Sequence, residues 1–407
     1  MKNVIAAKPS GPIRRVFAAR ALRAFGDGFI AVVLPAYLLA LGHGELEVGL
    51  ISTATLLGSA AMTLAVGRWG HRYSIRRLLL AVSLLMCATG WAFASVESLW
   101  PLLMVAFVSM LNPGGGDASP FLPLDHTLLA TTPVQQRTRV FARYSFIGSV
   151  CGAIGALAAG VPDWLTAGGA FTMLGALRAM FVLYGALGLA VWLLYVGLPD
   201  PQQDTQRRSR AALGPSRRVV WRLAALFSLD SFAGGLVLNS LLALWLFERF
   251  GMSLASAGAF FFWTGLFSAT SQLLAAPLAQ RIGLVNTMVF THIPANLCLI
   301  GAALAPTLTS ALALLLVRSA LSQMDVPARS AFVMSVVTPA ERPAAASFTA
   351  VPRSLASAAS PSLTGAMFAA GAMAAPLVLC GALKIAYDLA LFLAFRRAER
   401  DLVKEGT

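Results

Sequence analysis

The sequence predicts an all-α membrane protein with twelve transmembrane helices, arranged as two similar six-helix bundles. Of its 407 residues, 58% are hydrophobic and only 12% are charged. Soluble domains carry charge on about a quarter of their residues, so this chain cannot form a water-facing surface. The formal net charge is nevertheless +14. Apolar stretches of roughly twenty residues, the length that crosses a bilayer as a helix, separate the arginines. This pattern excludes a soluble enzyme, a soluble nucleic-acid-binding domain and a disulfide scaffold.

The twelve predicted spans follow one another as apolar stretches. The first six cover residues 16–41, 46–66, 78–97, 100–131, 141–162 and 173–197. The second six cover residues 220–247, 253–279, 284–305, 309–338, 345–370 and 373–395. We therefore expect an N-terminal bundle over 1–198, a basic linker over 199–219, and a C-terminal bundle with a tail over 220–407. A basic linker of this kind attracts anionic lipid head groups.

Basic residues mark every second connection between the predicted spans. Representative positions, in chain order, are Arg14, Arg68, Arg137, Arg217, Arg281, Arg342 and Arg396. The intervening connections carry mainly acids, namely Glu45, Glu47, Glu97, Asp163 and Glu248. Because lysine and arginine remain on the cytoplasmic side of membrane proteins, both termini are predicted to be cytoplasmic. The excess of arginine over lysine favours a bacterial source, and hence the bacterial inner membrane.

The two halves of the chain repeat the same short patterns in the same order. Asp27-Gly-Phe29, followed by a Leu-Leu-Ala-Leu segment, recurs as Asp230-Ser-Phe232 with the same segment after it. A Thr-Pro pair at Thr132 recurs at Thr338. This order, at nearly constant offset, predicts a duplicated six-helix unit, an arrangement that transporters use.

In the loop after the second span, Gly67, Arg72 and Arg76 match the pattern G-x-x-x-D-R-x-G-R-R, while His71, Ser74 and Ile75 replace the acid, the second glycine and an arginine. This loop therefore resembles the signature of the major facilitator superfamily. The second copy of the loop retains Arg281 and Gly283. The resemblance covers essentially the whole chain and implies that these residues form a cytoplasmic gate. It also implies a cavity lined by helices 1, 4, 7 and 10.

Acidic residues inside the spans are candidate functional groups, because an ionisable side chain at membrane depth costs roughly 2.5–3.5 kcal/mol even on insertion scales. The six acids are Asp27, Asp117, Asp125, Asp230, Asp325 and Asp388. Asp230 has no basic residue within one helical turn. An unpaired carboxyl group in a low dielectric binds a proton more readily. Asp230, Asp117 and Asp27 are therefore predicted to carry protons.

Basic residues inside the spans predict either ion pairs or an anion site. Residues four apart share a helix face, so Arg23 with Asp27, Asp325 with Arg329, and Lys384 with Asp388 can pair, the last as a structural pair. Three further arginines either pair with acids of other helices or bind anions bidentately: Arg178, Arg318 and Arg353. The candidate cavity residues are Arg23, Asp125, Asn239, Arg318, Asp325, Arg329 and Arg353.

The fourth span contains three consecutive glycines between Pro113 and Pro120, beside Asp117. Such a stretch does not hold a regular helix easily, and broken backbone at membrane depth occurs only where it is buried in protein or lines a cavity. We expect a discontinuous fourth helix whose freed backbone groups contact substrate or ion. The alternative is an extracellular loop between shorter spans.

The leading functional hypothesis is a secondary active transporter that exports a small lipophilic or amphiphilic molecule in exchange for protons. Uptake of an anionic nutrient at the arginines is one alternative, and export of a divalent metal ion through hard carboxylate ligands is another. The sequence has no zinc-protease motif, nucleophile elbow or P-loop, so neither an enzyme nor a nucleotide-driven pump is expected. We expect substrate, protons and membrane lipids as partners, no cofactor, no bound structural metal, no nucleic acid, and a monomer.

Overall fold

The computed structural model of the protein describes residues 11–114, 119–169, 171–199, 214, 216–338 and 341–405, and within these ranges it consists of helices and their connections. The first half contains α1 (Gly11–Ala40), α2 (Glu45–Trp69), the short 3₁₀ helix η2 (Gly70–Arg72), α3 (Ile75–Ser95), α4 (Leu99–Val108), α5 (Phe121–Leu129), α6 (Val134–Ala158), α7 (Val161–Ala167) and α8 (Met173–Val196). The second half contains α9 (Arg217–Gly235), α10 (Asn239–Phe250), α11 (Leu254–Ile282), α12 (Leu284–Leu304), α13 (Leu308–Leu321), α14 (Asp325–Val336), α15 (Arg342–Ala359), α16 (Pro361–Ala369) and α17 (Ala375–Glu405).

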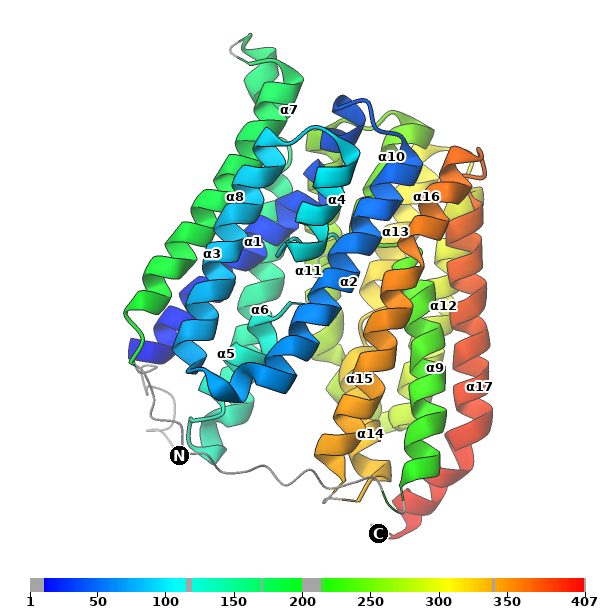
Figure 1. The fold of residues 1–407 in the computed structure, drawn as a ribbon. Helices are drawn as coiled ribbons and strands as arrows, with labels where there is room; N and C mark the ends of the chain where they lie inside the picture. The colour runs from blue at the N-terminus through cyan, green and yellow to red at the C-terminus, as the bar shows by residue number, and fades with distance from the viewer. Residues whose placement is uncertain are drawn as a thin grey trace, which may run out of the picture.

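The helices stand side by side as two bundles, and α1 begins and α17 ends at the same end of the molecule (Figure 1). We call this end the termini side and the opposite end the far side. Among the described residues, ten helical segments are long and apolar enough to cross a membrane. The prediction of an all-α membrane protein is therefore confirmed, and the described helices are consistent with twelve spans.

Four predicted spans consist of two helices each rather than one. They are the pairs α4 with α5, α9 with α10, α13 with α14, and α15 with α16. Only the first break was predicted. Two of the others follow from local chemistry: α9 ends on Gly234 and Gly235, which weaken a helix, and Pro361 begins α16 because its ring and missing N–H prevent α15 from continuing.

The two halves meet chiefly on the far side, where α2 packs against α16 and α6 packs against α11. Gly49 of α2 makes the first contact possible, because a Cβ atom there would lie 2.6 Å from the carbonyl oxygen of Pro361. A hydrogen bond of 3.0 Å from the Ser362 N–H to Thr53 Oγ1 crosses the same contact. On the termini side, the main neighbours of α5 are α1, α3 and α6, and those of α14 are α11, α12 and α15, all within their own halves.

Candidate functional site

A buried ion network inside the first half is centred on Asp125 of α5. Arg23 of α1 reaches across the bundle and pairs with its carboxylate at 2.5 Å. The hydroxyls of Tyr144 on α6 and Tyr195 on α8 donate to the same carboxylate at 2.8 and 2.9 Å. Asp125 is fully buried and Arg23 is 3% exposed. The negative charge of Asp125 is paired with Arg23, and both of its carboxylate oxygens accept hydrogen bonds. The network therefore links α1, α5, α6 and α8.

Arg23 pairs with Asp125 of another helix, a partner that the four-residue spacing from Asp27 did not predict. Asp27 lies one turn further along α1, where it is only partly buried and within electrostatic reach of Tyr184. The four-residue spacing places the two side chains on one helix face. Arg23 nevertheless binds Asp125, whose carboxylate also accepts hydrogen bonds from the Tyr144 and Tyr195 hydroxyls.

A second network, inside the second half, is centred on Asp230 of α9. Its Oδ1 atom accepts from Lys384 Nζ of α17 at 2.6 Å, and its Oδ2 atom lies 3.0 Å from Arg329 Nη1 of α14. Arg329 also pairs with Asp325 one turn back on α14, as the spacing predicts. Asp230 is 4% exposed and Asp325 is 3% exposed. This network therefore links three helices of the second half at membrane depth.

Two predictions about this network are wrong. Asp230 is not an unpaired acid, because its partners come from helices distant in the sequence. Lys384 does not pair with Asp388; it turns to Asp230, and Asp388 instead accepts a hydrogen bond from His292 Nδ1 of α12 at 3.0 Å. A spacing rule finds partners on one helix only, and these side chains face neighbouring helices.

The remaining intramembrane arginines have different surroundings. Arg178 pairs with Glu97, and both side chains are partly or largely exposed near the far side. Arg353 of α15 donates from Nε to Ser231 Oγ at 3.2 Å. Arg318 lies near the end of α13. Within the described part of the chain, no ion pair joins Arg318 or Arg353 to Asp125 or Asp325, two of the three predicted partners. The third, Asp117, lies outside the described residues.

The breaks in the fourth and seventh spans meet each other. Residues 109–114 are not helical, and Ser109 to Pro113 are buried within the protein. The N–H of Ser240, in the first turn of α10, donates to the carbonyl oxygen of Pro113 at 3.0 Å. The Tyr184 hydroxyl donates to the carbonyl oxygen of Met110 at 2.8 Å. The fourth span is therefore interrupted, and residues 109–113 of the interruption are buried in protein rather than in an external loop. Contact of this stretch with substrate or ion stays a prediction.

Two other predicted residues lie beside or within this region. Asn239 is the first residue of α10 and is partly exposed. Asp117 lies outside the described residues.

The residues of the predicted gate motif lie on the termini side. Arg72 and Arg281 are exposed at the ends of η2 and α11. Arg76 donates from Nη2 to the carbonyl oxygen of Val196 at 2.7 Å and so fastens the start of α3 to the end of α8. Gly283 has a φ of 93°, which the turn between α11 and α12 requires and which favours glycine. Gly67 is exposed on α2, and the side chain of His71 is outside the described part.

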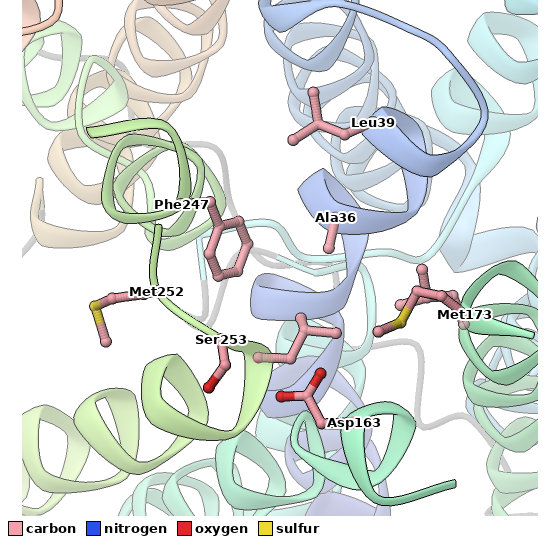
Figure 2. A pocket seen from close by; sticks show the side chains of 9 residues that line it. Ala36, Leu39, Asp163, Met173, Phe247, Met252 and Ser253 are labelled. Atoms are coloured by element: carbon pink, nitrogen blue, oxygen red, sulfur yellow. The ribbon is translucent and has the colours of Figure 1, made fainter. Parts of the chain in front are cut away.

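A pocket of about 280 Å³ lies at the far side, in the seam between the halves (Figure 2). Its lining is mainly apolar and includes Ala36 of α1, Met173 of α8 and Phe247 of α10. Asp163 of α7 is its one carboxylate, and it accepts a hydrogen bond from the N–H of Ala255 on α11. The described residues contain no group of three or more side chains that could hold a metal ion.

Sequence reasoning missed several residues of the two networks. The hydroxyls of Tyr144, Tyr195 and Tyr387 all lie at membrane depth, and Ser231 binds Arg353. Tyrosine is usually found at membrane interfaces, where its hydroxyl remains wet. Tyrosines in the middle of an apolar span, together with an intramembrane charge on another helix, are the signal that could have found them.

Comparisons with known proteins agree with this fold. The family model of the Major Facilitator Superfamily matches residues 16–323. An uncharacterized membrane protein of Saccharomyces cerevisiae, YJR124C, is 22% identical over 97% of this chain and 96% of its own length. A bacterial homologue of the human lysosomal transporter Spinster, in an inward-facing and occupied conformation, superposes with a TM-score of 0.75 at 17% identity, covering 96% of this chain and 98% of that one. The nucleoside transporter NupG superposes with a TM-score of 0.73 at 14% identity, covering 94% and 99%.

Proposed function

The chain belongs to the major facilitator superfamily, and we propose that it exports a small amphiphilic molecule in exchange for protons. Membership establishes an integral membrane transporter rather than an enzyme. The proton coupling, the direction and the substrate class are our proposals. The observation that carries the coupling is the position of Asp230, whose two carboxylate oxygens bind cations from two different helices at membrane depth.

Two cations hold Asp230 in its ionised form in the described conformation, so its protonation requires that Lys384 or Arg329 move away from it. Once protonated, the neutral carboxyl group no longer attracts them. The charged and titratable groups that surround it include Lys384, Cys380, Asp388 and Tyr387 on α17, Arg329 and Asp325 on α14, His292 on α12, and Arg353 on α15. The protonation state of the Asp230 carboxyl group therefore controls how α9, α14 and α17 are held together. This is the kind of two-state element that couples a proton to a conformational change.

The arrangement of the halves supports alternating access. They are joined on the far side, while α5 and α14 on the termini side pack within their own halves. We propose that the termini side is cytoplasmic, because the basic connections gather there. The described state is then an inward-facing one, the conformation that the Spinster homologue of similar fold is reported to adopt. The bacterial inner membrane stays a prediction, and the full-length relative is a yeast protein.

Export of a divalent metal ion receives no support from the described residues, because the two oxygens of Asp230 are already bound to cations. Transport of an anionic compound, the other alternative, is favoured by one specific observation: within the described part of the chain, Arg353 donates a hydrogen bond to the Ser231 hydroxyl and forms no ion pair with an acid.

A growth screen of expressing cells against toxic compounds identifies a transported molecule, and proteoliposomes then test the coupling. We expect a pH gradient to drive transport by the wild type. Asp230→Asn should retain exchange of the compound down its own gradient and lose the response to pH. Glu97→Gln is the matched control, because Glu97 is an exposed acid at the far side. Wild-type transport that is indifferent to a pH gradient would refute the coupling.

A further inference from the structure

Two arginines of the second half share one aromatic ring. The guanidinium carbon of Arg329 lies 5.4 Å from the centre of the Phe227 ring, and that of Arg353 lies 5.9 Å from it. Arg329 is already paired with two acids, whereas among the described residues Arg353 hydrogen-bonds only to Ser231, through its Nε atom. Two like charges beside one ring repel each other, so this arrangement favours an anion between or beside them.

Buried hydrogen-bond donors next to these arginines lack acceptors. Within the described residues, Arg329 Nε and the Tyr387 hydroxyl are both buried without a hydrogen-bond partner. Tyr387 is 1% exposed and Arg329 is 7% exposed. The centre of the Tyr387 ring lies 6.4 Å from the centre of the Phe227 ring, on which Arg329 also packs. Buried donors without acceptors are costly, so an acceptor-rich group completes this site.

The ion pairs of the cluster leave Arg353 apart from the acids. Lys384 and Arg329 bind Asp230, and Arg329 also binds Asp325. Asp388 hydrogen-bonds His292. Within the described residues no ion pair joins Arg353 to an acid, so an anion bound beside it would offset the cost of a charge in the low dielectric of the membrane interior.

We propose that Arg353 and Arg329, with the Tyr387 hydroxyl, bind the anionic head group, a carboxylate or a phosphate, of the transported amphiphile. Guanidinium groups suit both oxyanions because they donate two parallel hydrogen bonds. The ring of Phe227 supplies an apolar surface next to the head group. This inference rests on the proposed function, since it names the substrate class of the same transporter.

Equilibrium binding to the purified protein in nanodiscs of zwitterionic phosphatidylcholine tests the proposal. Phenyl phosphate and benzoate are the anionic probes, and benzamide is their neutral counterpart. We expect at least one anion to raise the melting temperature saturably and benzamide to leave it unchanged. Arg353→Gln should weaken anion binding at least about tenfold, the effect of losing a charge-assisted hydrogen bond. Equal stabilisation by benzamide, no saturable binding of either anion, or full binding by Arg353→Gln would each overturn the proposal.

Two further variants keep this result separate from misfolding. Tyr387→Phe removes only a hydroxyl without a hydrogen-bond partner and should weaken anion binding severalfold, and Arg353→Lys should restore part of what Arg353→Gln loses. Arg178→Gln, which removes an arginine paired at the membrane edge, should bind the anions like the wild type. No pH gradient is present in this measurement. Anion binding without proton-driven transport would therefore overturn the coupling and leave the anion site intact. Proton-driven transport without anion binding would overturn the anion site and leave the coupling intact.

Discussion

The carboxylate of Asp163 on α7 accepts a hydrogen bond of 2.8 Å from the backbone N–H of Ala255 on α11. An acid of the first half thereby caps the first turn of a helix in the second half, where the orphan N–H groups and the helix dipole both favour a negative charge. Thr53 plays the same part for Ser362 at the start of α16. Both contacts lie on the far side and join the halves in the described state.

Loss of the Asp163 cap should favour separation of the halves on the far side. Removing a capping side chain costs about 1 kcal/mol, so Asp163→Ala should shift the balance of states by roughly fivefold. Spin labels at Ser98 and Ala370, two exposed far-side positions, would report this as a larger population of long distances. Glu248→Gln, an exposed far-side change, is the control. An unchanged distance distribution in Asp163→Ala would show that this bond does not hold the closed state.

The network around Asp125 should be essential for stability. Arg23→Ala leaves a buried carboxylate without its cation, which costs about 3–5 kcal/mol. Replacing both partners, as in Arg23→Met with Asp125→Leu, should recover much of that loss because no buried charge remains. Denaturation of the purified protein in detergent measures both effects. Arg178→Ala, at an exposed pair, should change little. A double variant as unstable as Arg23→Ala would contradict the explanation.

Close packing of α1 against α6 should distinguish two neighbouring glycines. A Cβ atom on Gly155 would lie 2.1 Å from the carbonyl oxygen of Phe25, whereas one on Gly152 would lie 3.5 Å from that of Ala24, an ordinary contact. Gly155→Ala should therefore destabilise the protein by about 1–3 kcal/mol, the usual cost of overpacking. Gly152→Ala is the matched control and should be tolerated. Equal melting temperatures for the two variants would argue against this packing.

Glu341, in the connection before α15, should make stability depend on acid pH. Hydrogen bonds from Ser216 and Thr338, and from the N–H of Gly214, lower the pKa of Glu341 to about 2. Because the folded pKa lies below the usual 4.5, this stabilisation is present above about pH 4.5 and is lost as the pH falls toward 2. The melting-temperature difference between wild type and Glu341→Gln should shrink over that interval. A difference that does not vary with pH would contradict the assignment.

Hydropathy and charge alternation sufficed to predict the spans, because both follow from the cost of placing polar groups in lipid. The pair of Asp325 with Arg329 was predictable for the same reason that it forms, since both residues lie on one helix face. The partners of Asp230 could not be predicted in this way, because Lys384 and Arg329 reach it only after three helices have packed. The glycine pair at Gly234 and the proline at Pro361 carried usable signals for two breaks that periodicity alone concealed.

The hydrogen bond from Ser240 to the carbonyl oxygen of Pro113 joins two interrupted spans, one from each half. A rocking motion displaces the two ends of a bundle most and its centre least, so a link at the centre can persist while the contacts at either end exchange. This backbone hydrogen bond lies where the pivot of such a motion would be. Since it uses main-chain atoms on both sides, Ser240→Pro, which lacks the donating N–H, is the substitution that removes it directly, and the pivot is set by the paths of the two interrupted helices.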